Sequence, residues 1–192
     1  LVGNGASMVT LYQLRRFVAF FVKLYQSSSI ESFSLSSEVL EFLQAIGKVF
    51  SKYSQLAGSS FSDKERRAVT DQLSLAGENY RKKVYDGLSG STVIIKRENL
   101  IRFLEASLET LEHCITAGKR EDGLYHSYML LEFSKDSLKL RPLQLMLEGQ
   151  AAILGSGLIK PRQILNLLDS LFASELYCNK RQSFMLYPFA DI

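Results

Sequence analysis

His126 stands between Tyr125 and Tyr128 in an aromatic segment without helical or strand periodicity. Histidine serves as an acid, a base or a ligand near neutral pH, so it is the most suggestive titratable side chain of the sequence. A histidine that forms a hydrogen bond within the core or at its edge is the more frequent case, and we favour it. A metal site with two histidines is not predicted, because His113 falls near the end of a predicted helix, far from His126.

Glu132 and Glu148 are the candidates for glycoside chemistry, which uses two carboxylates, or one carboxylic acid and phosphate in a phosphorylase. Glu148 shares a helix face with Gln144, which favours a solvated position. Glu132 lies between Leu131 and Phe133 and is either buried with them or directed outward. Hydrolysis by the pair requires both carboxylates to face one cleft at a separation of roughly 5 to 9.5 Å. We assign no catalytic residue.

The end of the chain combines aromatic, amide and guanidinium side chains, as in Tyr177, Arg181, Gln182 and Tyr187. Sugar sites use flat rings that stack on the sugar and polar groups that bind its hydroxyls. The same composition also fixes a chain end to a helical core, and this is the interpretation that we favour. The residues predicted for a glucoside-contacting surface are Tyr125, His126, Tyr128, Arg181 and Gln182.

Apolar residues recur with helical spacing in six segments. A capping box from Ser62 to Glu65 begins the third segment, and Pro161 occupies the first turn of the last. We predict helices at about residues 10–26, 37–57, 62–85, 98–117, 142–154 and 161–174.

Three stretches lack this spacing. Ser27 to Ser37 is rich in serine and is predicted to be a loop. Thr92 to Ile95 is β-branched and is either a strand or an extended entry into the next helix. Gly123 to Phe133 is predicted to be extended or partly helical.

The succession of helices predicts an all-α fold, either a helical bundle or a layered helical array, with short extended aromatic segments. We expect a single domain over residues 1–192. Residues 1–118 form its four-helix part, and residues 119–192 contribute the aromatic segment, a helix pair and the tail.

The composition excludes several classes of protein. With 23 Lys and Arg against 20 Asp and Glu, the net charge of +3 is too evenly spread for a nucleic-acid surface. The apolar run from Phe17 to Val22 is shorter than the roughly 20 residues of a membrane span. No phosphate loop, nucleophile elbow or zinc-ligand spacing occurs, so no cofactor and no metal is predicted.

Cys114 and Cys178 lie far apart in the sequence and indicate no disulfide framework, which favours the cytoplasm. The chain opens at Leu1 without an initiator methionine or a signal-peptide pattern. We therefore expect it to be a piece excised from a longer protein.

Three groups of residues resemble a segment of large bacterial proteins described as cellobiose-phosphorylase-like. The match covers roughly the last third of the chain and, more faintly, Leu1 to Met8. The groups are Gly123 to Tyr128, Met146 to Gln150 with Gly155 to Gly157, and Leu176–Tyr177 with Ser183 to Pro188.

The resemblance implies a much longer chain that contains an α/α toroid and acts on glucosides. In that family the catalytic acid is an aspartate in a short motif, which has no counterpart here. The expectation is therefore a non-catalytic helical domain whose partners are other domains of the same chain and a carbohydrate. The alternative is a helical interaction or structural module that binds no sugar and whose aromatic tail docks another domain or subunit.

Overall fold

The computed structural model describes residues 5–53 and 61–188. The chain forms two compact units. The first unit comprises Leu1–Phe17, Leu111–Glu132 and Lys139–Ile192, and the second comprises Val18–Thr110 and Phe133–Leu138.

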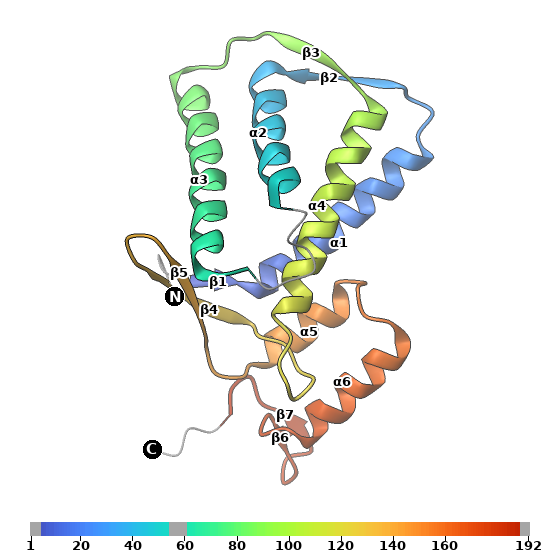
Figure 1. The fold of residues 1–192 in the computed structure, drawn as a ribbon. Coiled ribbons are helices and arrows are strands. Elements are labelled where there is room, and N and C mark those ends of the chain that lie inside the picture. Colours follow the sequence, from blue (N-terminus) through green and yellow to red (C-terminus); the bar gives the residue numbers. More distant parts are fainter. Residues whose placement is uncertain (1–4, 54–60, 189–192) are drawn as a thin grey trace. The chain divides into compact units, whose positions relative to one another are not determined.

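The expected all-α fold is wrong, because 59% of the chain is helical and 17% is strand. The described strands form three small antiparallel sheets, with the orders β1-β4-β5, β2-β3 and β6-β7 (Figure 1). The protein is therefore a mixture of helices and sheets, in which short strands connect or cross the helices that the periodicity predicted.

Two helix–strand–helix segments build most of the second unit, and in each the strand continues directly into the following helix. The start of the first helix, up to Phe17, and the end of the last helix, from Leu111, belong to the first unit. The two strands pair antiparallel, with Ser34 opposite Ile94 at the centre of the register. Figure 1 shows α2 between α3 and α4, with the strand pair across their ends. The elements are α1 (Met8–Ser27), β2 (Ser32–Ser36), α2 (Ser37–Tyr53), α3 (Asp63–Asp86), β3 (Thr92–Lys96) and α4 (Arg97–Ala117).

Strand β2 lies in the serine-rich stretch that was predicted to be a loop. Phe33 and Leu35 alternate there with more exposed serines, which is the period of a strand with one covered face. Ser36 then begins α2, because its Oγ accepts a hydrogen bond from the amide of Val39 at 3.4 Å. The predicted end of this helix at Ala57 lies outside the described residues.

The start of α3 confirms the predicted capping box. The Ser62 hydroxyl accepts a hydrogen bond from the Glu65 amide at 3.3 Å, and the Glu65 carboxylate accepts one from the Ser62 amide at 2.8 Å. Helices α2 and α3 meet through the stacked rings of Phe42 and Tyr80, whose centroids lie 4.8 Å apart. The stacked rings therefore join α2 to α3.

The remaining elements lie in the first unit, except for Phe133 at the end of β4 and Leu138 at the start of β5. Pro142 was predicted to open a helix, but it ends β5, and the helix begins only at Leu147. The alternation of Leu138 and Leu140 with charged residues is the strand signal that the prediction missed, and Pro142 is tolerated because β5 is an edge strand. The bounds are β1 (Gly5–Ser7), β4 (Tyr128–Phe133), β5 (Leu138–Pro142), α5 (Leu147–Gly155), α6 (Pro161–Ala173), β6 (Tyr177–Cys178) and β7 (Ser183–Phe184).

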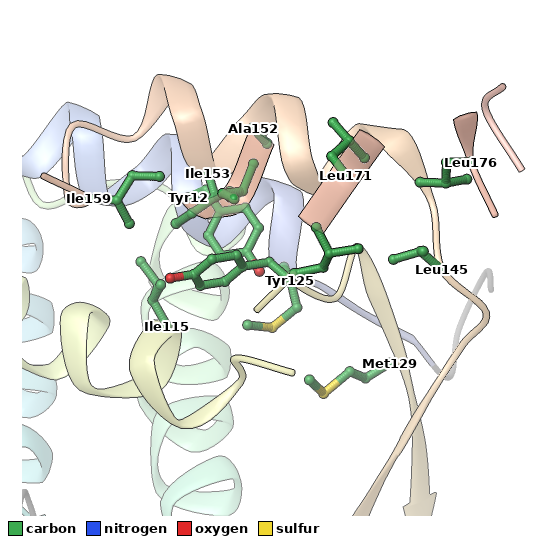
Figure 2. Close-up of a cluster of buried hydrophobic side chains, with 13 residues drawn as sticks. Tyr12, Ile115, Tyr125, Met129, Leu145, Ala152, Ile153, Ile159, Leu171 and Leu176 are labelled. Carbon is green, nitrogen blue, oxygen red and sulfur yellow. The ribbon is translucent and has the colours of Figure 1, made fainter. Parts of the chain in front are cut away.

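A cluster of buried apolar side chains forms the core of the first unit (Figure 2). Its centre is the ring of Tyr12, which meets the ring of Tyr125 edge to face at a centroid distance of 6.2 Å. Residues from α4, α5 and α6 complete the cluster, among them Ile115, Ile153 and Leu171. In the part of the chain that the structure describes, no helix has the length and apolar character needed to cross a bilayer.

Candidate functional site

The backbone of Tyr125 is bound by the side chain of Gln150, a fully buried residue of α5. Gln150 Oε1 accepts a hydrogen bond from the Tyr125 amide at 3.0 Å, and Gln150 Nε2 donates to the Tyr125 carbonyl at 2.7 Å. Nε2 also donates to the carbonyl of Met146 at 3.1 Å. The carboxamide thus takes the place that a neighbouring strand would have, and it satisfies both polar groups of a buried peptide.

The next two residues are bound from both sides. The Tyr12 hydroxyl donates to the His126 carbonyl at 2.8 Å, and the Met8 amide donates to the Ser127 carbonyl at 2.9 Å. From α5, the Gly149 amide donates to Ser127 Oγ at 2.7 Å. We name Tyr12, Tyr125, His126, Ser127, Gly149 and Gln150 the buried junction.

Gly149 is required by this packing. A Cβ atom placed on it would lie 2.5 Å from Ser127 Oγ and 3.1 Å from the His126 carbonyl oxygen. No side chain fits between α5 and the segment before β4 without moving one of them. The glycine therefore allows the close approach on which the hydrogen bonds of the buried junction depend.

Sequence reasoning placed the motif residues Gly149 and Gln150 in the resemblance but missed their role. The predicted inward face of this helix was Leu143, Met146, Leu147, Ala151 and Leu154. Met146 is buried as predicted, but Gln150 and Ile153 are buried too and were not on the predicted face; the three are spaced i, i+4 and i+7. A glutamine within an otherwise apolar stripe is the signal that could have identified a buried hydrogen-bonding side chain.

The side chain of His126 is half-buried beside an ion pair. Arg120 Nη2 lies 2.6 Å from Asp122 Oδ2. Burial, and to a lesser degree the charge of Arg120, lower the pKa of His126, while Asp122 acts in the opposite direction. At neutral pH the imidazole is therefore uncharged and offers one donor and one acceptor.

Tyr128 is placed at the start of β4, and its hydroxyl donates to Glu148 Oε2 at 2.8 Å. This hydrogen bond is the main cause that raises the pKa of Tyr128, followed by burial and by the charges of Glu148 and Tyr187. The end of the described chain is fixed nearby, because the Leu147 amide donates to the Leu186 carbonyl at 3.1 Å. The tail is thus held against the start of α5.

Arg181 and Gln182 lie exposed in the turn between β6 and β7, where Gln182 has a positive φ of 48°. The base of this hairpin is an aromatic cluster of Phe172, Tyr177 and Phe184, with ring centroids 4.9 to 5.1 Å apart.

The structure thus splits the predicted glucoside surface into groups with different surroundings. Tyr125 is buried, while His126 and Tyr128 are half-buried. Within residues 5–53 and 61–188, no hydrogen bond or ion pair joins the side chains of Arg181 or Gln182 to these three residues.

The two carboxylates proposed for glycoside hydrolysis have separate partners. Glu132 Oε1 lies 2.8 Å from Arg141 Nε, which joins β4 to β5. Glu148 accepts the hydrogen bond from Tyr128. Each side chain therefore has a local structural role, and hydrolysis by this pair stays a hypothesis that nothing in these contacts supports.

The second unit holds a buried carboxylate. Glu38, in the first turn of α2, is 5% exposed, and its Oε1 accepts hydrogen bonds from the amide and the hydroxyl of Ser89 at 2.9 and 2.5 Å. These bonds, that of the hydroxyl first, lower the pKa of Glu38 to about 2. The carboxylate thus joins α2 to the residues before β3 while it remains charged.

Three hollows in the second unit are lined by described residues. Between α2 and α3 lie two of them, of about 480 and about 120 Å³, and at least half of the side chains around each are charged or amide. The third, of about 590 Å³, lies between α2, β3 and α4 and has mainly apolar walls.

No group of three or more His, Cys, Asp or Glu side chains is placed to hold a metal ion in the described part of the chain. The residues that could bind a ligand in the first unit are thus the half-buried His126, the Tyr128–Glu148 pair and the polar turn at Arg181. No family model matches this sequence, and no curated protein matches it either.

Proposed function

We propose that this chain is a non-catalytic accessory domain of a larger carbohydrate-active protein, of the cellobiose-phosphorylase-like kind that its last third resembles. Its partners are then other domains of the same parent chain. The distant cysteines favour a cytoplasmic setting.

One observation carries the proposal. The motif residues Tyr125, Ser127, Gly149 and Gln150 bind one another through backbone and side-chain hydrogen bonds in the interior. Polar groups that already form these hydrogen bonds cannot bind a substrate. The motif therefore has a structural role, because it joins α1, α5 and the segment before β4.

The experiment is a titration of the protein with cellobiose, glucose and glucose 1-phosphate, followed by NMR chemical shifts. We expect no saturable shift at millimolar ligand. The proposal fails if one of the three sugars binds saturably and if His126→Ala and Arg181→Ala each weaken that binding, because both predicted parts of the glucoside surface would then contribute.

A second candidate is direct contact with a glucoside through the β6–β7 hairpin alone. Phe172 is 53% exposed beside Tyr177, and the adjoining turn presents Arg181 and Gln182 to solvent. A ring with neighbouring amide and guanidinium donors is the combination that sugar sites use. Binding that is weakened by Phe172→Ala and Arg181→Ala but is unchanged in His126→Ala would support this candidate.

A further inference from the structure

The third hollow of the second unit is a groove that neither the predicted sites nor the proposed function uses. Its volume of about 590 Å³ lies within the range of roughly 300 to 1,000 Å³ of pockets for small ligands. Residues of α2, β3 and α4 line it, three elements whose course Figure 1 shows. The apolar ones include Leu43, Ile94, Phe103 and Ala106. Ile94 is 67% exposed, which is a high fraction for so large an apolar side chain.

Gly47 keeps the groove open on the side of α2. A Cβ atom on this residue would lie 3.6 Å from Phe103 Cδ2, which is an ordinary van der Waals contact. Alanine would thus fit at this helix position and would stabilise the helix relative to glycine. Since packing within the second unit does not require the glycine, its effect is to leave space above the ring of Phe103.

Arg102 is the charged residue among those that line the groove. It is exposed, and its Nη2 donates to Oδ1 of Asn99, one helical turn earlier. Within the described residues no ion pair joins Arg102 to a carboxylate. A guanidinium has five N–H donors, and the Asn99 amide nitrogen adds two more. The rim at this end of the groove is therefore rich in donors and positively charged.

A ligand that complements the groove has an apolar tail and an anionic, planar acceptor at one end. A carboxylate meets the second requirement, because it can accept two parallel hydrogen bonds from a guanidinium. We propose that this groove binds a monocarboxylate with an apolar tail, which lies between Leu43, Ile94 and Phe103 while the carboxylate binds Arg102. A free sugar matches neither the apolar walls nor the charged rim.

The test is a calorimetric and NMR titration of the protein with octanoate below its micelle-forming concentration. Butanoate and octylammonium serve as comparators for the tail and for the charge. We expect saturable binding of octanoate, with contacts from its methyl end to Phe103 and Ile94. Butanoate should bind at least about tenfold more weakly, because it lacks four CH₂ groups that octanoate buries. Octylammonium should also bind at least about tenfold more weakly than octanoate, because its charge has the same sign as that of Arg102.

Two variants separate the parts of the site. Arg102→Gln should weaken octanoate about tenfold and should not weaken octylammonium, because it removes the positive charge and preserves the apolar walls. Gly47→Leu should abolish binding of octanoate by filling the groove, and a circular-dichroism melt checks that this variant is folded. Arg16→Gln, at another exposed arginine, is the matched control and should bind like the unchanged protein.

Three results would overturn the assignment. The first is the absence of saturable octanoate binding, which would leave the groove as a surface for another part of a longer protein. The second is equal affinity for octanoate and octylammonium. The third is an Arg102→Gln variant that binds octanoate as tightly as the unchanged protein does. This third test remains decisive even if the Gly47→Leu variant does not fold. None of them bears on the accessory role, whose test uses residues of the first unit.

Discussion

The carboxamide of Gln150 and the peptide of Tyr125 form a closed pair of hydrogen bonds, one at 3.0 Å through Oε1 and one at 2.7 Å through Nε2. A side-chain amide has the donor and the acceptor of a backbone peptide at nearly the same spacing. Gln150 therefore pairs with the Tyr125 peptide as a neighbouring strand residue would, and it attaches α5 to the segment before β4.

Replacing Gln150 with glutamate should destabilise the fold by about 3 to 5 kcal/mol, because the buried side chain would lose both donated hydrogen bonds and bring an unpaired charge into the interior. Urea unfolding followed by circular dichroism measures the change. Gln144→Glu makes the same chemical change at an exposed residue and should cost less than about 0.5 kcal/mol. Equal effects at both positions would show that the Gln150 pair contributes nothing specific.

Gly149→Ala should destabilise the protein by about 2 kcal/mol or more, since its Cβ would overlap Ser127 Oγ at 2.5 Å. Gly155 offers a control in the same helix, because a Cβ there meets nothing within 4 Å. Gly155→Ala should be neutral or stabilising by up to about 1 kcal/mol, as the helix propensity of alanine requires. Thermal melts of both variants show whether each substitution raises or lowers the stability of the fold. A stabilised Gly149→Ala protein would contradict the described packing.

Tyr12→Phe should cost about 1 to 2 kcal/mol, because the His126 carbonyl loses the donor that now lies at 2.8 Å. Burial and, secondarily, the charge of Tyr125 raise the pKa of Tyr12. Its phenol should thus stay protonated in alkaline solution while the fold persists. Absorbance titration of the protein and of the variant gives this difference, with the 83% exposed Tyr85 replaced by phenylalanine as the control. An ionisation step near pH 10 that is missing only in Tyr12→Phe would refute the burial.

The contribution of Glu38 to stability should depend on pH. Its pKa in the folded protein is about 2, below its ordinary value of 4.5, because Ser89 donates two hydrogen bonds to the carboxylate. The folded state thus favours the charged form, so the stabilisation is complete above pH 4.5 and is lost as the pH falls from 4.5 towards 2.

Glu38→Gln tests this dependence in urea unfolding at pH 7 and pH 2.5. The variant should be clearly less stable than the unchanged protein at pH 7, and the difference should shrink at pH 2.5. Glu78→Gln, at an exposed residue of α3, should show no such pH-dependent difference. A constant difference between the two pH values would rule out the link to the carboxylate charge.

The imidazole of His126 should titrate below its ordinary value of 6.5. Arg120→Ala should raise the pKa of His126, because it removes a positive charge. Asp122→Asn should lower the pKa, because it removes the charge that favours the imidazolium and leaves Arg120 without its partner. NMR titration of the imidazole carbon-bound protons measures this pKa in all three proteins. A lower pKa in Arg120→Ala together with a higher pKa in Asp122→Asn would contradict the placement of the ion pair.

Local signals in the sequence predicted the parts of the fold that depend on neighbouring residues. The capping box at Ser62 and the proline at the first turn of α6 are such signals, and the structure confirms both. Strands β2 and β5 were missed, because a short alternating stretch acquires its hydrogen bonds only from a partner elsewhere in the chain. The buried junction depends even more on distant parts of the chain, since the hydrogen bond from Tyr12 to His126 spans 114 positions of sequence.

The predicted site residues came from side-chain type, and type alone does not distinguish a ligand contact from a structural one. Tyr125 carries the aromatic ring expected of a sugar site, yet its ring lies in the core and its peptide binds Gln150. The position of Glu38 in the sequence did not indicate its burial either, because a glutamate in the first turn of a helix normally lies in solvent. In each case burial decides the role, and burial depends on the packing of distant elements.

The direct passage from strand to helix, at Ser36–Ser37 and at Lys96–Arg97, sets a rule for how this protein can change in length. A single inserted residue would turn the following helix by about 100° against its strand. It would also exchange the two faces of the strand. Neither change can be absorbed, because no spacer separates the two elements. Evolutionary gain or loss of residues should therefore avoid both joints and fall in connections such as Lys135–Asp136 at the tip of the β4–β5 hairpin.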